Sequence, residues 1–402
     1  MDERSGRNAA ADDPERTGST PPRTGTIPRF RPVVGRFLDY RPAAEPEARG
    51  ALVKLSQNES PYGPLPSVEK ALAAGLRGIN RYPDNHAVPL VEALAGRLRV
   101  PDESVVVGAG AVGVIQMLLQ AVAEPGAEIM YAWRSFEAYP LLVSLAGMAN
   151  VQVPLREERH DLAAMADAVT ERTRLVFVCN PNNPTGTVVS RAELTAFLDR
   201  VPPTCLVVLD EAYQEYVRDP EAADGLALWR DHPNLVAVRT FSKAYGLAGL
   251  RVGYLVGHAA VAEAVRKHTV PYSVNAVAQA AALASLAAED ELLERVETTV
   301  KERARVAGAL LAQGWDVPGS EGNFVWLRLG ERTADFADAC ASEGVCLRPF
   351  AGTGVRVSIG CPEENDAFIA VAADYVRRGA DAPVVDDAMV DDAVVDDAVV
   401  DP

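Results

Sequence analysis

The sequence lacks an apolar run of the roughly 18 residues that a membrane-spanning helix requires, although 48% of its 402 residues are hydrophobic. Its first 25 residues also lack the apolar segment of a secretory signal, so we expect the protein to remain in the cytoplasm. Cysteine is scarce, and none of the five cysteines forms a Cys-x-x-Cys pair. The five histidines show no metal-ligand spacing. Neither a disulfide framework nor a metal site is therefore expected.

Basic residues are in the minority, because 39 Lys and Arg stand against 56 Asp and Glu, for a formal net charge of −17. Residues 381–402 contain eight Asp and no Lys or Arg, and we expect this repetitive acidic stretch to form a flexible tail. Residues 1–30, rich in Pro, Gly, Thr and mixed charge, are expected to be disordered. The remaining chain has no basic stripe, so no nucleic-acid partner is expected.

Seven apolar runs in the first two thirds of the chain predict strands. They are Ser104–Val107, Glu128–Tyr131, Val151–Pro154, Arg174–Cys179, Cys205–Leu209, Asn234–Arg239 and Arg251–Val256. Most are continuous rather than alternating, which is typical of strands buried on both faces of a mostly parallel sheet. Helical stretches such as Ala111–Ala123 and Ser135–Ala146 lie between them. The pattern predicts an α/β fold with helices on both faces of the sheet.

The pattern changes after about residue 270. A long helical region is followed by short strands and two further helices: Ala276–Gln313, then Asn323–Leu329, Ala334–Glu343, Val345–Pro349, Val355–Ile359 and Glu363–Arg378. We expect a large ligand-binding domain over residues 71–270. Residues 31–70 and 271–380 are expected to form a smaller α+β domain with an N-terminal arm.

Four of the predicted strands end in polar groups, and ligands of open α/β sheets bind beyond the carboxyl ends of the strands. The first end, Gly108–Gly113, is glycine-rich and runs into a helix, which suits an anion; a tight turn that needs positive φ explains it equally well. The second, Asn180–Gly186, contains three asparagines and two prolines and is also compatible with an ordinary turn.

The other two ends carry charged side chains. Asp210 ends an apolar strand, where a carboxylate is costly unless it is paired or caps the next helix. The segment Arg239–Arg251 combines hydroxyls, Lys243 and Arg251, and hydroxyls with an arginine make a phosphate cup. Lys243 can form an imine with a carbonyl, and its mostly apolar or small neighbours argue against a solvated surface lysine. An anion site, a carboxylate, an amide and a lysine together fit pyridoxal phosphate (PLP).

The ordered motifs resemble the fold-type-I PLP-dependent aminotransferases. Within these they are similar to the histidinol-phosphate aminotransferase group, including its actinobacterial aromatic-amino-acid relatives, over about residues 30–378. The resemblance is carried by five motifs: Gln57–Pro64, Arg81–Asp84, Asn180–Gly186, Asp210–Tyr213 and Ser242-Lys243. It implies a large domain with a mostly parallel seven-stranded sheet between helices, and a smaller α+β domain.

The resemblance also implies roles for residues around the cofactor ring. Lys243 would hold PLP as a Schiff base and then move the proton during catalysis. Asp210 would pair with the pyridine nitrogen, and Asn183 and Tyr213 would bind the phenolic oxygen. Phe136 would stack on the ring.

The cofactor's phosphate and the substrate have implied partners as well. The phosphate would be bound by the backbone of Gly110 and Ala111 and by the side chains of Thr240, Ser242 and Arg251. Tyr82 would reach the phosphate of the second subunit of a homodimer. Arg356 would bind the substrate α-carboxylate through a bidentate fork. Arg348 would lie near the substrate's other end, unless it is a surface arginine, and Tyr62 would form a pocket wall.

The implied reaction is a ping-pong transamination between an amino acid and a 2-oxo acid such as 2-oxoglutarate. The amino acid would be phenylalanine, tyrosine or histidinol phosphate. Many histidinol-phosphate enzymes carry an acidic pair after the glycine-rich turn, whereas Ala111-Val112-Gly113 stands here, closer to the aromatic-substrate relatives. Ser60 likewise replaces the second Asn of the usual Asn-Glu-Asn-Pro. Two alternatives are a PLP-dependent decarboxylase or lyase and a non-catalytic PLP-binding regulator module.

Overall fold

The computed structural model describes residues 30–36 and 52–380. Residues Met1–Leu38 form a unit of their own, in which only a short 3-10 helix, η1 (Pro32–Arg36), is described. Everything below concerns the second unit, Asp39–Pro402. The predictions of a disordered N-terminus and an acidic C-terminal tail fall, except for Phe30, on residues outside those described.

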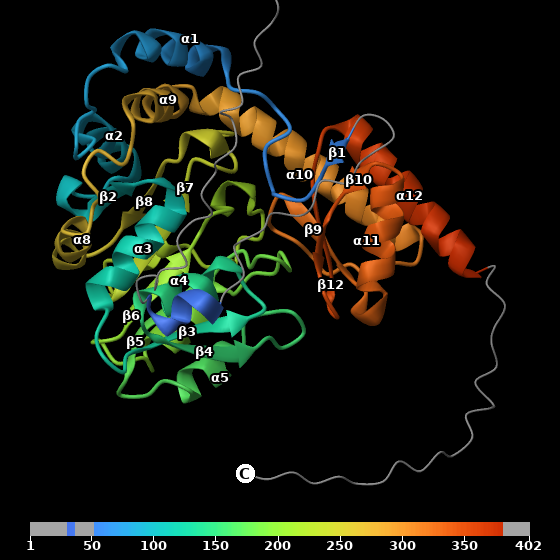
Figure 1. The fold of residues 1–402 in the computed structure, drawn as a ribbon, viewed down its shortest axis with the longest axis horizontal. Helices are drawn as coiled ribbons and strands as arrows, with labels where there is room; N and C mark the ends of the chain where they lie inside the picture. Colours follow the sequence, from blue (N-terminus) through green and yellow to red (C-terminus); the bar gives the residue numbers. More distant parts are fainter. Residues whose placement is uncertain (1–29, 37–51, 381–402) are drawn as a thin grey trace, which may run out of the picture. The chain divides into compact units, whose positions relative to one another are not determined.

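Seven strands form the large sheet in the order β2-β8-β7-β6-β5-β3-β4 (Figure 1). β8 runs antiparallel to both of its neighbours, and the other neighbouring pairs are parallel. The strands are β2 (Val105–Gly108), β3 (Glu128–Trp133), β4 (Ala149–Pro154), β5 (Thr173–Cys179), β6 (Leu206–Asp210), β7 (Leu235–Thr240) and β8 (Gly253–Val256). Each lies on one of the apolar runs that predicted a strand, so the prediction of a mostly parallel seven-stranded sheet is confirmed.

Two hydrophobic cores cover the opposite faces of this sheet. In β5, Leu175 and Phe177 point into one core, and Val176 and Val178 point into the other. The first core includes α3 (Gly110–Val122), α4 (Ala138–Ala146) and α8 (Ala259–Arg266), and the second includes α5 (Leu162–Asp167) and α6 (Arg191–Leu198). The continuous apolar runs therefore reflect burial on both faces, as predicted.

A third core lies at the β2 edge of the sheet. It joins α1 (Pro66–Gly75), α2 (Val88–Leu98) and α9 (Ala276–Ala287) to residues of β2, β8 and the segment after β7. α9 packs along α1, although the two helices are far apart in the sequence (Figure 1). A short helix, α7 (Gly225–Leu228), lies against β7.

The C-terminal part has a separate core beneath a three-stranded antiparallel sheet, β11-β12-β9. Its elements are β9 (Phe324–Arg328), β11 (Arg348–Phe350), β12 (Gly354–Ser358), α10 (Glu289–Ala312), α11 (Thr333–Ser342) and α12 (Pro362–Ala380). The prediction of one strand over Val345–Pro349 is wrong. β10 (Val345–Cys346) pairs in parallel with β1 (Val53–Lys54), and the chain then joins a different sheet as β11. The predicted domain boundaries at residues 70 and 270 remain predictions.

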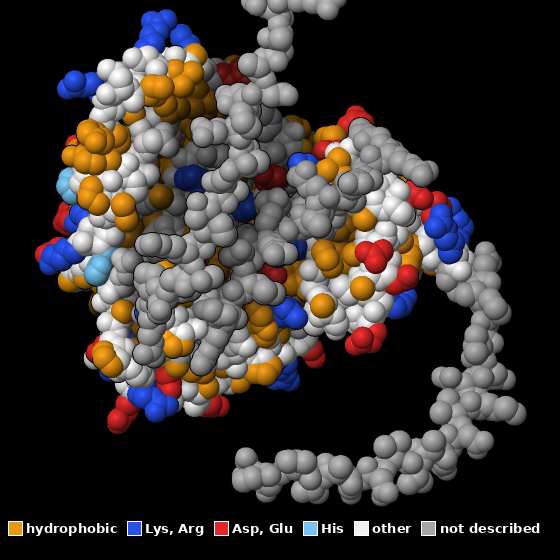
Figure 2. Space-filling model, viewed as in Figure 1, with side chains coloured by type: hydrophobic (Ala, Val, Ile, Leu, Met, Phe, Trp, Pro, Cys, Tyr) orange, Lys and Arg blue, Asp and Glu red, His pale blue; other side chains and the backbone are white. Residues whose placement is uncertain are grey.

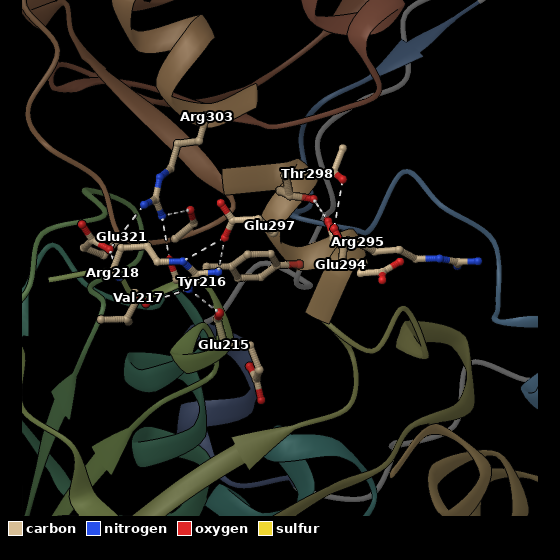
Figure 3. Close-up of polar contacts among 12 residues, drawn as sticks. Glu215, Tyr216, Val217, Arg218, Glu294, Arg295, Glu297, Thr298, Arg303 and Glu321 are labelled. Carbon is tan, nitrogen blue, oxygen red and sulfur yellow. Dashed lines mark hydrogen bonds and ion pairs between the residues drawn. The ribbon is translucent and has the colours of Figure 1, made fainter. Parts of the chain in front are cut away.

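A network of polar contacts joins α10 to the segment that follows β6 (Figure 3). Arg303 of α10 donates to the carbonyl oxygens of Tyr216 and Gly322 at 3.2 and 2.9 Å, and its guanidinium lies 3.3 Å from Glu321. Arg218 pairs with Glu297 at 3.1 Å. The Arg303 side chain is only 9% exposed. Its partners therefore have to compensate the free energy that is lost when its charge is removed from water.

We predict that Arg303→Met lowers the free energy of unfolding by roughly 3 kcal/mol, because it removes the donor of two carbonyl oxygens and the cation paired with Glu321, which keeps only the Arg218 N–H. Arg305→Met on the same helix is the control. Arg305 is 41% exposed and pairs with Glu302 and Asp366, so its loss should change stability by less than about 1 kcal/mol. Denaturant unfolding followed by circular dichroism measures both. Equal losses would contradict a stabilising role specific to Arg303.

None of the helices in the described part of the chain has the length and apolar character needed to cross a membrane. The same residues contain no cluster of three or more His, Cys, Asp or Glu side chains arranged to hold a metal ion.

Candidate active site

A cavity of about 470 Å³ lies beyond the carboxyl ends of β5, β6 and β7, where the polar strand ends predicted a ligand site. Most of the predicted site residues line it: Ala111, Phe136, Asn183, Asp210, Tyr213, Thr240, Ser242, Lys243, Arg251, Arg348 and Arg356. Tyr62 and Tyr82 are not among the lining residues. Gly110 lies beside the cavity at the start of α3.

One end of the cavity is a cup of hydrogen-bond donors. Gly110 has φ +73° and opens the 13-residue helix α3, and a Cβ at this position would collide with the Arg251 guanidinium. Arg251 Nη1 donates to Ser242 Oγ at 3.4 Å, and Thr240 Oγ1 lies 3.0 Å from the same hydroxyl. A helix N-terminus, two hydroxyls and a guanidinium thus surround one point, which suits a phosphate group. The turn also has the positive φ that glycine permits, as the alternative interpretation of this motif expected; anion binding stays a prediction.

Asp210 is a buried carboxylate at the end of β6, with 4% of its surface exposed. Tyr139 Oη donates to it at 2.6 Å, and the Ala212 N–H lies at 3.3 Å. Burial raises the pKa of Asp210. Among residues 30–36 and 52–380, no cation forms an ion pair with this carboxylate, and it is not the cap of the next helix, where Tyr213 occupies the N-cap position. A ligand that brings a positive charge to Asp210 would remove the cost of its burial.

Lys243 lies partly buried on the loop after β7, and its Nζ donates to the carbonyl oxygen of Gln57 at 2.9 Å. Burial and, to a smaller extent, the positive charges of Arg356 and Arg251 lower the pKa of Lys243 to about 7, against the opposing effect of Glu59. A substantial fraction of the amine is therefore uncharged near neutral pH. An uncharged amine is the form that attacks a carbonyl or accepts a proton.

Asn183 and Tyr213 face the cavity with their positions fixed by other buried groups. Asn183 Oδ1 accepts from Arg356 Nη1 at 2.5 Å, and Tyr213 Oη accepts from Asn58 Nδ2 at 3.0 Å. Asn58 is 1% exposed with φ +53°, and its Oδ1 accepts from Ser358 Oγ at 3.0 Å. The sequence motif contained Asn58, but no role was assigned to it; an Asn followed by Glu-Ser-Pro in a polar segment was the available signal.

Asn182 is a second residue without a predicted role that organises the site. Its side chain is fully buried, and its Oδ1 accepts from Ser135 Oγ at 2.9 Å and lies 3.1 Å from His160 Nε2. Its Nδ2 donates to the carbonyl oxygen of Arg134 at 3.2 Å. Asn182 thus links the loop that carries Phe136 to the loop that carries Asn183.

Two arginines occupy the wall formed by β11 and β12, where Arg348 and Arg356 are direct cross-strand partners. Arg356 is 6% exposed and also donates to the carbonyl oxygen of Ser56 at 2.6 Å. Arg348 pairs with Glu137 at 2.9 Å, and its side chain is 15% exposed. Arg348 is therefore not a surface arginine, which was the alternative interpretation from sequence.

The cavity lies at the carboxyl edge of a mostly parallel sheet and contains a lysine, a buried aspartate and a cup of donors. This combination is typical of a cofactor-dependent α/β enzyme. The chain belongs to the family described as aminotransferase class I and II, whose sequence model matches residues 51–371. The predicted family, fold and enzyme class are thereby confirmed.

The chain is 62% identical over 354 residues to an aromatic amino acid aminotransferase of Thermobifida fusca, covering 87% of this chain and 98% of that protein. It is 56% identical over 352 residues to the protein of the same name from Streptomyces coelicolor, covering 87% and 98%. Among solved structures, histidinol-phosphate aminotransferase from Sinorhizobium meliloti in complex with pyridoxal-5'-phosphate is similar with a TM-score of 0.81. It is 29% identical, and the match covers 88% of this chain and 99% of that chain.

The lowered pKa of Lys243 predicts a distinctive pH profile for its chemical reactivity. In the cofactor-free protein, trace acetylation of Lys243 should rise with pH up to about 7 and then level off. Acetylation of a short lysine peptide added free in solution should instead keep rising to roughly pH 10, because only the uncharged amine reacts. Peptide mass spectrometry measures the two lysines in the same sample. Parallel profiles for both would contradict the lowered pKa.

Proposed function

We propose that this protein is a PLP-dependent aminotransferase that moves the amino group of an aromatic amino acid to a 2-oxo acid such as 2-oxoglutarate. The observation that carries the proposal is the meeting of three groups in one cavity. These are a lysine with a lowered pKa, a buried aspartate that forms no ion pair with another described residue, and a cup of donors that suits a phosphate. PLP has a carbonyl, a basic ring nitrogen and a phosphate, one for each of them.

The described residues fit this cofactor. Because Gly110 has no Cβ, the Arg251 guanidinium can lie against the start of α3, so that the backbone N–H groups of the helix and the guanidinium could bind one phosphate together. Asp210 would hold the ring nitrogen in its protonated form, and Asn183 and Tyr213 would bind the phenolic oxygen. When bound, PLP supplies an electron-poor ring that withdraws electrons from the substrate's α-carbon.

The chain's own residues would then position the substrate and move the proton. Arg356 would bind the α-carboxylate through its guanidinium fork. Lys243, once its amine is released, would accept the proton from the α-carbon and return it, a role that suits a base with a pKa of about 7. Phe136 would cover one face of the ring.

An aromatic substrate is favoured by the apolar lining of the cavity. Val112, Ile115 and Phe136 all line it, and Ala111-Val112 stands where an acidic pair is typical of histidinol-phosphate enzymes. The relatives with more than half of their residues identical are named aromatic amino acid aminotransferases. Histidinol phosphate is the second candidate, because Arg348 offers a cation for its phosphate.

A homodimer is proposed from an exposed apolar surface near α1 and α2. The Tyr82 side chain is 82% exposed and stacks on Tyr272, with ring centroids 4.6 Å apart. Leu76, Ile79 and Val270 are also more than half exposed, and Figure 2 shows hydrophobic side chains gathered over α1. Such a surface is typical of an interface. Tyr82 would reach the partner's phosphate cup.

We also propose that the protein works in the cytoplasm. All five cysteines are free thiols, which is typical of proteins from a reducing compartment.

The proposed reaction is tested by supplying PLP, 2-oxoglutarate and one amino donor at a time. Phenylalanine or tyrosine should yield glutamate and the aromatic 2-oxo acid, and kcat/KM for histidinol phosphate should be at least about 10-fold lower, because the apolar lining of Val112, Ile115 and Phe136 suits an aromatic ring better than a charged phosphate group. Lys243→Ala should lower kcat by 10³-fold or more. Chromatography of both products makes the measurement. Release of carbon dioxide without glutamate would favour a decarboxylase, and no turnover with bound PLP would favour a regulator module.

Tyr82→Ala should weaken PLP binding about 10-fold, which corresponds to about 1.4 kcal/mol for a lost phosphate hydrogen bond. The dimer can be tested by mixing this variant with Lys243→Ala after dissociation and reassociation. A mixed dimer contains one complete site, because the Lys243→Ala subunit lends its Tyr82 to the subunit that keeps Lys243. Activity at limiting PLP should therefore exceed that of either variant alone. No gain on mixing would contradict a contribution of Tyr82 across an interface.

A further inference from the structure

An ion pair joins two parts of the cavity wall that are far apart in the sequence. Glu137 lies at the N-cap position of α4, next to Phe136, and Arg348 lies on β11. Arg348 Nε and Nη2 donate to Glu137 Oε2 at 3.0 and 2.9 Å. Both residues line the cavity. The pair is therefore part of the wall of the space that a substrate side chain would enter.

The position of this pair follows from the strand register. Arg348 and Arg356 are direct partners in the β11–β12 ladder, so two guanidinium groups extend from the same face of the small sheet. Like charges at opposed positions repel one another. Glu137 compensates the charge of Arg348, while Arg356 donates to Asn183 and to the Ser56 carbonyl.

The proposed reaction places two different side chains in this one cavity in turn. An aromatic amino acid brings one carboxylate and an uncharged ring, whereas a dicarboxylic 2-oxo acid brings a second carboxylate. Next to a ring, an arginine without an anion would be a costly desolvated charge. Next to a second carboxylate, the same arginine is the natural partner.

We propose that Glu137 is a specificity-determining residue that exchanges with the substrate for Arg348. This inference rests on the proposed function. With an aromatic side chain in the cavity, Glu137 stays paired and neutralises Arg348. With a dicarboxylic 2-oxo acid, the distal carboxylate takes Arg348, and Glu137 turns toward water.

Two features of the pair suit such an exchange. The Glu137 side chain is 30% exposed while Arg348 is 15% exposed, so a displaced Glu137 gains water and is not left as a buried, unpaired charge. The two donors of Arg348 meet a single oxygen of Glu137. A two-oxygen fork is the stronger arrangement, and an incoming carboxylate can provide it.

The test uses unreactive ligands, so that it does not depend on turnover. Calorimetry measures binding of glutarate, a dicarboxylic analogue, and of 3-phenylpropanoate, an aromatic one, to the PLP-loaded enzyme. Glu137→Gln should tighten glutarate binding by about 5-fold, because the competing anion is gone, and should weaken 3-phenylpropanoate binding by a similar factor, because Glu137 no longer compensates the charge of Arg348 near the ring. Glu263→Gln, at an exposed glutamate paired with Lys267, is the control and should change neither.

A second variant separates this role from a structural one. Arg348→Gln should weaken glutarate binding at least 10-fold and leave 3-phenylpropanoate within about 2-fold. In that background, adding Glu137→Gln should have no further effect on either ligand. Shifts of the same sign for both ligands, no shift in Glu137→Gln, or an effect that persists without Arg348 would overturn the proposal. An enzyme that binds both ligands but does not transaminate would instead contradict the proposed function alone.

Discussion

The site depends on one buried guanidinium. Arg356 of β12 donates to the side chain of Asn183, in the loop after β5, and to the carbonyl oxygen of Ser56, in the segment before α1. A cation that is 6% exposed must keep such partners, so the three segments are held together around the cavity. Burial is the larger cause of the lowered pKa of Lys243, and the positive charge of Arg356 adds to it. One guanidinium therefore contributes both to the structure of the site and to the chemistry of the proposed base.

Burial shifts the pKa values of Asp210 and Lys243 in the direction that makes the neutral form of each more stable. It raises the pKa of Asp210 and lowers that of Lys243. Each group is thereby poised for a partner from outside the chain: a cation for the aspartate, and a carbonyl carbon for the lysine. The cavity wall formed by β11 differs, because Arg348 is paired with Glu137 from the same chain. At the proposed cofactor end a ligand would supply the opposite charge, whereas at the proposed substrate end a side chain of the protein supplies it.

Much of the fold was predictable because its signals are local. Continuous apolar runs such as Leu175–Val178 identify strands buried on both faces, whatever the rest of the chain does. The break between β10 and β11 was not predictable, because it depends on pairing with β1, near the other end of the chain. Many of the residues that line the cavity lie in recognisable motifs. Asn58 and Asn182 lie in such motifs too and Glu137 does not, but the roles of all three come from contacts with distant segments, which a local pattern does not encode.

These contacts give the two ends of the cavity different mechanical properties. Around Asn58, Asn182 and Tyr213, fully buried amides and hydroxyls bond to one another, and a buried polar group that loses its partner carries a large penalty. Breaking the contacts at that end is therefore costly, which suits a cofactor held through every turnover. The Glu137–Arg348 pair is partly open to water on the Glu137 side, so breaking it costs less. A ping-pong enzyme needs this asymmetry, because the cofactor stays in place while two unlike side chains alternate at the opposite wall.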